Sequence, residues 1–187
     1  SHLETGHYFN PHAQRIIEAK NGGARIAVVD TRLSNTSTHA DRWISPWPGS
    51  EAAMLLAVAR LLLTSGRVDK EFMERWTNWQ DYLTAKDPSG PKTLDRYLEL
   101  LAEEYVKFTP AYAIAECQIE EGTVEYLADR IFEAGSAFTS HLWRSTAAGN
   151  LGGWQVARAL MLLHSLTGSV GTKGGLNPNS WDKFVPK

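Results

Sequence analysis

The chain has 187 residues, with 19 Lys and Arg against 21 Asp and Glu, so its formal net charge is −2; this argues against a protein that binds nucleic acid by neutralising phosphates. Apolar residues make up 43% of the chain, enough for a buried core, and the longest apolar run, 52–59, is far shorter than the ~20 residues that span a bilayer. The one cysteine, Cys117, excludes an internal disulfide, and a structural zinc site or iron–sulfur cluster held by this chain alone.

The N-terminal pattern predicts a helix followed by two short strands. Apolar residues cluster on one side of 10–20, and Asn-Gly-Gly at 21–23 is a typical helix stop because glycine adopts the left-handed conformation at low cost. Residues 25–30 form an almost unbroken apolar run that ends in a carboxylate, which is typical of a strand in a parallel sheet covered on both faces. A polar loop at 34–38 separates this strand from a second one at 40–44.

A turn at 46–50 leads into the clearest helix of the chain. Residues 51–63 are apolar on nearly all sides, so this helix is expected to be buried. Ser50 suits the N-cap, Glu51 suits the positive end of the helix dipole, and Ser-Gly at 65–66 ends the helix.

The rest of the chain is mainly helical by pattern. We expect a loop at 86–91, a strand at 136–143, and helices at 69–76, 94–107, from Thr109-Pro110 onward, 123–133 and, after the glycine pair at 152–153, up to Leu166. Helix and strand therefore alternate at both ends of the chain around a helical stretch. We predict a single α/β domain over 1–187, with three layers (α/β/α), a mostly parallel Rossmann-like sheet and a helical insert at about 69–134.

Two carboxylates are candidate ligand-binding groups. Asp30 stands at the carboxyl end of a strand, where open α/β sheets bind ligands and where an acidic residue often holds ribose hydroxyls. Glu51 starts a helix, and its carboxylate can accept two hydrogen bonds from the N1–H and N2 amino group of guanine. The alternatives are a solvated Asp that begins a turn and an ordinary helix-dipole Glu. If both bind one nucleotide, they face one cavity of nucleotide width.

The other motifs and residues of the sequence do not indicate a binding or metal site. The chain has neither a G-x-G-x-x-G fingerprint nor a Walker A motif, so ordinary NAD and ATP sites are poorly supported. His2, His7 and His12 recur every five residues and share no helix or strand face, so they do not indicate a metal site. His164 is expected to be structural, and Cys117 a small buried filler.

Several segments, in this order, resemble the molybdopterin-guanine-dinucleotide oxidoreductases of the dimethyl-sulfoxide-reductase type. Val-Val-Asp-Thr-Arg at 28–32 resembles that family's Val-Val-Asp-Pro-Arg, and Pro-Gly-Ser-Glu at 48–51 resembles its Pro-Gly-Thr-Asp before a long apolar helix. Phe-Thr-Pro at 108–110 is similar to its Tyr-Thr-Pro-Glu. Leu-Thr-Gly-Ser-Val-Gly at 166–171, with Gly-Gly at 174–175, is similar to its Leu-Thr-Gly-Asn-x-Gly…Gly-Gly close.

The resemblance implies a role for each matching residue in holding a guanosine arm of the pterin cofactor. Asp30 takes the ribose, Arg32 lies near the nucleotide, and Glu51 reads the guanine edge with Pro48 and Gly49 shaping the turn. Looser matches place two N-terminal residues on the diphosphate path and one later residue near the pterin: Glu4, His7 and Arg144.

The resemblance also implies what the rest of the protein supplies. Family members are several times longer, so this chain would be about a quarter of a molybdenum or tungsten enzyme, and the isolated chain is expected to be inactive and to hold no metal. The implied cofactor is molybdopterin guanine dinucleotide, with any iron–sulfur cluster carried outside this chain.

The implied partners are the remainder of the catalytic subunit and an iron–sulfur electron-transfer subunit, with no nucleic acid and no membrane insertion by this segment. Family members occur in the cytoplasm, or in the periplasm after twin-arginine export. Two alternatives stay open: a structural paralogue without molybdenum, such as the large peripheral-arm subunit of respiratory complex I, and a free-standing nucleotide-binding module.

Overall fold

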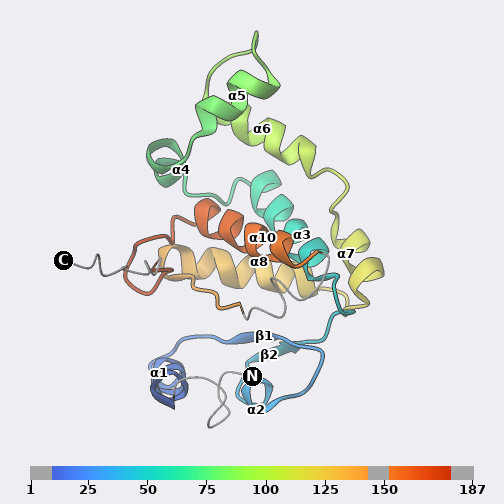
Figure 1. The fold of residues 1–187 in the computed structure, drawn as a ribbon, viewed down its shortest axis with the longest axis vertical. Helices are drawn as coiled ribbons and strands as arrows, with labels where there is room; N and C mark the ends of the chain where they lie inside the picture. The colour runs from blue at the N-terminus through green and yellow to red at the C-terminus, as the bar shows by residue number, and fades with distance from the viewer. Residues whose placement is uncertain (1–9, 143–151, 178–187) are drawn as a thin grey trace, which may run out of the picture.

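The computed structural model describes residues 10–142 and 152–177, and in this part the fold is mostly helical with one small parallel sheet (Figure 1). Helix α1 spans Asn10–Asn21 and ends, as expected, before Gly23, whose φ of +100° favours glycine. Strands β1 (Ala27–Val29) and β2 (Arg42–Ile44) pair in parallel, with Ala27 opposite Arg42 and Val29 opposite Ile44. Both predicted strands are therefore present, each shorter than expected.

The connection between these strands contains a helix that the sequence did not predict. Residues 34–38 were expected to be a polar loop, whereas Asn35–Thr38 forms the single turn α2. The backbone N–H of Ser37 donates to the Ser34 hydroxyl oxygen at 3.4 Å, so Ser34 caps this turn. A turn made only of polar residues has no apolar periodicity, and for that reason the pattern failed to indicate it.

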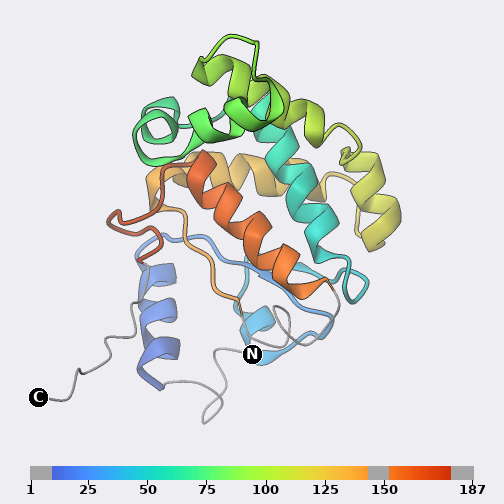
Figure 2. The ribbon, with the colours of Figure 1, turned by 45° about the horizontal axis from the view of Figure 1, so that its top comes forward.

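Helix α3 (Glu51–Thr64) forms the centre of the core, as its apolar sequence predicted. Met54, Val58 and Leu62 are completely buried. The helix contacts α7 (Pro110–Cys117), α8 (Thr123–Ala134) and α10 (Gly153–Leu166), and Figure 2 shows α3 and α10 lying side by side.

The start of α3 differs from the prediction in one detail. Ser50 occupies the N-cap position, but its side chain does not cap the helix. Its hydroxyl donates instead to the main-chain oxygen of Trp47 at 2.6 Å, because the turn before the helix brings that carbonyl within reach.

Three helices lie beyond α3: α4 (Lys70–Trp76), α5 (Trp79–Lys86) and α6 (Leu94–Glu104). Helix α5 was not predicted, because it buries only two apolar side chains, Trp79 and Leu83, too few to set up a helical period. Helix α6 ends at Glu104 rather than at 107. The predicted N-cap of α7 is confirmed, since the Thr109 hydroxyl accepts a hydrogen bond from the N–H of Tyr112 at 3.1 Å.

The strand predicted at 136–143 is wrong over the residues that the structure describes. Gly135–Ala137 is a short 3-10 helix, and 138–142 has no regular structure; Trp143 lies outside the described residues. Side chains attach this segment to α10 instead of to a strand: the Phe138 ring stacks on the His164 ring at 4.5 Å, and the Ser140 hydroxyl contacts its Nε2 at 2.8 Å. The sheet of the described part therefore has two strands, fewer than the predicted Rossmann-like sheet.

Candidate functional site

The parallel pairing brings two candidate segments to one edge of the sheet. Asp30 follows β1 and Ser45 follows β2, and the N–H of Asp30 donates to the Ile44 oxygen at 3.1 Å, extending the ladder to the strand ends. The carboxyl ends of parallel strands are where α/β proteins bind ligands. The Asp30 turn and the segment that leads to Glu51 therefore start from the same edge.

Asp30 is half-buried and forms a local turn. Its Oδ1 accepts the backbone N–H of Arg32 at 3.0 Å, the bond of an Asx turn. Within the described chain its second carboxylate oxygen has no hydrogen-bond partner, and the Arg32 side chain is exposed. The turn therefore presents one carboxylate oxygen and one guanidinium at the sheet edge.

The turn before Glu51 is anchored to the end of α7. The N–H of Trp47 donates to the Cys117 oxygen at 2.7 Å, and the Cys117 thiol donates to the Ser50 oxygen at 3.2 Å. Gly49 has φ +88°, so this position of the turn favours glycine, and Pro48 beside it is exposed. Cys117 is thus more than the predicted filler, and burial raises the pKa of its thiol.

Glu51 carries an unsatisfied acceptor. The side chain is half-buried, and its Oε2 is shielded from solvent with no hydrogen-bond partner among the described residues. A buried polar atom without a partner typically costs about 1–3 kcal/mol. The first turn of α3 is the positive end of the helix dipole and favours a carboxylate here, but it does not satisfy the hydrogen-bonding capacity of this oxygen.

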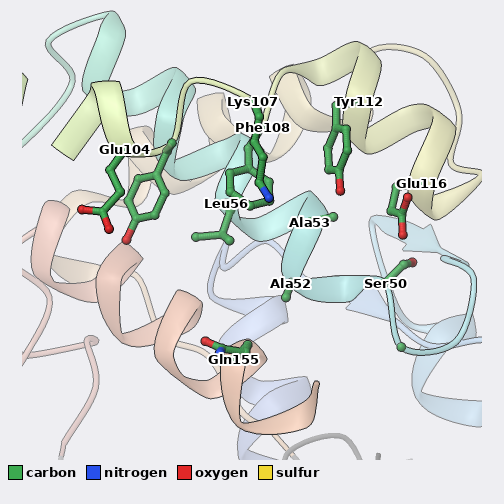
Figure 3. A pocket seen from close by; sticks show the side chains of 12 residues that line it. Ser50, Ala52, Ala53, Leu56, Glu104, Lys107, Phe108, Tyr112, Glu116 and Gln155 are labelled. Atoms are coloured by element: carbon green, nitrogen blue, oxygen red, sulfur yellow. The ribbon is translucent and has the colours of Figure 1, made fainter. Parts of the chain in front are cut away.

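A cavity of about 470 Å³ lies beside this turn, between α3, the α6–α7 connection and α10 (Figure 3). Ala52, Ala53 and Leu56 line it from α3, while Tyr112, Glu116 and Gln155 extend toward it from α7 and α10. A second cavity of about 240 Å³ borders β2.

Neither of these two cavities is the nucleotide cavity that the sequence predicts. Of the predicted site residues that the structure describes, only Gly49 lines the larger cavity, and neither of the two cavities includes Asp30 or Glu51. A cavity shared by these two carboxylates stays a prediction.

The structure does not place the remaining three candidates. Glu4, His7 and Arg144 are outside the described residues.

Within 10–142 and 152–177, no three or more His, Cys, Asp or Glu side chains gather as a metal site would require. In the same ranges, none of the helices has the length and apolarity needed to cross a bilayer.

The comparisons with known proteins define the family. A model for molybdopterin oxidoreductases matches residues 9–183, so the chain belongs to the molybdopterin oxidoreductase family. This confirms the resemblance seen in the sequence segments. The family implies a molybdenum or tungsten pterin cofactor.

Similar proteins are much longer than this chain. A probable dimethyl sulfoxide reductase chain YnfF of Escherichia coli K12 is 29% identical over 89% of this chain and 21% of its own. The dimethyl sulfoxide reductase DmsA of the same organism is 30% identical over 83% of this chain and 19% of its own. The acetylene hydratase from Pelobacter acetylenicus shares the fold, with a TM-score of 0.71 and 18% identity over 90% of this chain and 20% of that one. The chain thus spans about a fifth of the length of these proteins.

Proposed function

We propose that this chain is the part of a molybdenum or tungsten oxidoreductase that holds one guanosine arm of a pterin guanine dinucleotide. The observation that carries the proposal is the Glu51 carboxylate oxygen, which is buried at the start of α3 and has no partner in the described part of the chain. Guanine offers an N1–H and an N2 amino group side by side, and a carboxylate can accept from both. Adenine has no such pair of donors on the corresponding edge.

The other residues take separate parts of the nucleotide. Asp30 accepts hydrogen bonds from the ribose hydroxyls through the oxygen that its turn leaves open, and Arg32 lies near the nucleotide, where its charge suits a phosphate. Pro48 and Gly49 shape the turn that delivers Glu51. We further propose that three residues outside the described part continue the site along the diphosphate and the pterin: Glu4, His7 and Arg144.

The reaction itself belongs to the cofactor and to the rest of the enzyme. When bound, the metal pterin supplies a two-electron exchange, usually with transfer of an oxygen atom. This chain's residues bind and orient the nucleotide arm and contribute no catalytic group.

We also propose that the remainder of the catalytic subunit completes the fold. Additional strands beside β1 would extend the two-stranded sheet into a three-layer α/β/α domain, with 69–134 as its helical insert. The whole subunit would transfer electrons through an iron–sulfur partner. A structural paralogue without the cofactor is disfavoured, because a buried unpartnered carboxylate lowers stability unless a ligand satisfies it.

A nucleotide titration tests the proposal. In the full-length polypeptide that contains this chain, prepared without its pterin, we expect calorimetry to show GDP binding about tenfold or more tightly than ADP, from the cost of leaving buried hydrogen-bonding groups unpaired. Glu51→Gln should reduce this preference, because an amide offers one acceptor group where the carboxylate offers two. Asp30→Asn should weaken both nucleotides together, because both contain ribose.

The matched control is Glu125→Gln, which removes an exposed carboxylate from the first turn of another helix, α8. It should leave both affinities unchanged. Equal affinity of the wild type for GDP and ADP would return Glu51 to the role of an ordinary helix-start charge.

A further inference from the structure

The three main-chain oxygens of the Asp30 turn each accept a hydrogen bond from a side chain outside 30–32. The indole Nε1 of Trp43 donates to the Asp30 oxygen at 2.7 Å. The hydroxyl of Ser45 donates to the Thr31 oxygen at 3.3 Å, and that of Ser37 donates to the Arg32 oxygen at 3.3 Å. Three successive carbonyls are therefore held by donors from three different positions in the chain.

The shortest of these bonds crosses the sheet. Trp43 lies in β2 opposite Val28 of β1, and its indole N–H reaches past the end of β1 to the Asp30 carbonyl. Trp43 as a residue is 39% exposed, so burial does not by itself account for a tryptophan at this position. An indole has one donor and no acceptor, which suits it to hold a carbonyl.

The position of this bond matters for the carboxylate of the same residue. The Asp30 N–H is bound to Ile44, its carbonyl to Trp43, and its Oδ1 to the N–H of Arg32. With these three groups fixed, the second carboxylate oxygen is the one polar group of Asp30 without a partner in the described chain. Fixing a binding group before the ligand arrives removes part of the ordering cost of binding.

We infer that Trp43 is a positioning residue that holds the Asp30 turn in the conformation that accepts a ribose diol. The inference rests on the proposed function for its ligand, whereas the bond to the turn is a feature of the fold alone. Ser45 supports the same turn through a longer bond. Neither side chain is assigned a contact with the nucleotide.

The test uses Trp43→Phe, which keeps an aromatic ring and removes the donor. In the full-length polypeptide without its pterin, the probes are GDP and its 2′,3′-dideoxy analogue, which lacks the diol. The ratio of their dissociation constants measures recognition of the ribose. We expect Trp43→Phe to lower the wild-type preference for GDP by about three- to tenfold, the usual effect of one lost neutral hydrogen bond. Ser45→Ala should act in the same direction with a smaller effect.

A matched control and a second measurement separate positioning from stability. Trp76→Phe changes a tryptophan that is 75% exposed at the end of α4 and should leave the ratio unchanged. Hydrogen exchange of the Arg32 amide, which donates to Asp30 Oδ1, should become at least about threefold faster in Trp43→Phe because the turn opens more often. A purely structural role would weaken both nucleotides equally and keep their ratio, and that result would overturn the inference.

Different results would contradict ribose binding by Asp30 and the positioning role of Trp43. A wild type that binds GDP and the dideoxy analogue equally contradicts the assignment of Asp30 to ribose, and with it the ribose part of the inference. Unchanged exchange of the Arg32 amide in Trp43→Phe shows that Trp43 does not hold the turn, whatever the wild type binds.

Discussion

His164 is completely buried in the last turn of α10 and connects two neighbouring segments. Its Nε2 contacts the Ser140 hydroxyl at 2.8 Å, and its Nδ1 contacts the Ser169 hydroxyl at 2.7 Å. A neutral imidazole satisfies this arrangement with one donor and one acceptor nitrogen. Burial lowers its pKa to about 4, because the charged form is poorly solvated there.

This lowered pKa predicts a loss of stability in acid. The unfolded chain binds a proton at His164 near pH 6.5 and the folded chain near pH 4, so stability falls as the pH decreases through this window. At pH 4 this proton binding to the unfolded chain lowers the free energy of unfolding by about 3 kcal/mol relative to pH 7. We expect His164→Gln to be less stable at pH 7 but to lose about 3 kcal/mol less than the wild type between pH 7 and pH 4.

Urea unfolding at pH 7, 5.5 and 4 measures this difference. Carboxylates titrate in both proteins, so comparison of the two curves isolates the histidine. Parallel curves for the wild type and His164→Gln would show that His164 does not titrate with folding.

Single residues differ in how far the sequence could predict them. Asp30 and Glu51 could be singled out as candidates because a strand-end and a helix-start carboxylate are each recognisable positions. Trp43 and Cys117 could not, because their hydrogen bonds go to main-chain carbonyls that only the fold brings near. Such contacts leave no pattern in the order of residue types.

At the scale of elements, the end of α10 is hydrogen-bonded to the residue that caps the start of α4. The N–H of Asp69 donates to the Leu166 oxygen at 2.7 Å, and its Oδ1 accepts from the N–H of Phe72 at 2.9 Å, which caps α4. Gly168 faces this cap with φ +65°, and a Cβ there would lie 2.4 Å from Asp69 Oδ2 and 3.1 Å from the Phe72 Cβ. Glycine is thus required here by contact as well as by conformation.

We therefore predict that Gly168→Ala destabilises the chain by about 3 kcal/mol, combining left-handed strain with disruption of the cap. Gly66→Ala is the matched control, because Gly66 has a similar φ of +68° and open space around its Cβ position. It should cost only about 1–2 kcal/mol. Urea denaturation of both variants checks the difference, and equal losses would show that Asp69 moves aside without cost.

Elements with a strong local signal were the predictable ones. The apolar run of α3 and the Thr109 cap of α7 specify their helices within a few residues. Helix α5 has too few buried positions to show a period, and the β-like run from 136 contains side chains that bind α10 rather than a neighbouring strand. In both cases tertiary contacts decide the structure.

At the scale of the whole molecule, the outer edge of β1 has no neighbouring strand among the described residues. The Ile26 oxygen accepts from Arg42 and the Asp30 N–H donates to Ile44, so alternate residues of β1 face β2. Ala27 and Val29 therefore direct their main-chain groups to the outer edge, and both are exposed, Val29 by 41%. Parallel sheets normally have both faces covered and rarely stop at two strands. This edge and the Glu51 oxygen, which has no partner among the described residues, are the two features behind our proposal that other parts of a full-length subunit complete the fold and the site.

Hydrogen exchange followed by mass spectrometry tests this view of the edge. In the isolated chain, a peptide covering 25–31 should exchange its outer amides, those of Ala27 and Val29, within the fastest phase, because they have no partner in the described residues. In the full-length polypeptide we expect about two amides of the same peptide to exchange more slowly, since a strand added beside β1 would accept their hydrogen bonds. A peptide covering 54–62 in the buried centre of α3 serves as the control and should be protected in both. Identical exchange of peptide 25–31 in the two proteins would show that no strand is added at β1 and would remove the proposed three-layer domain.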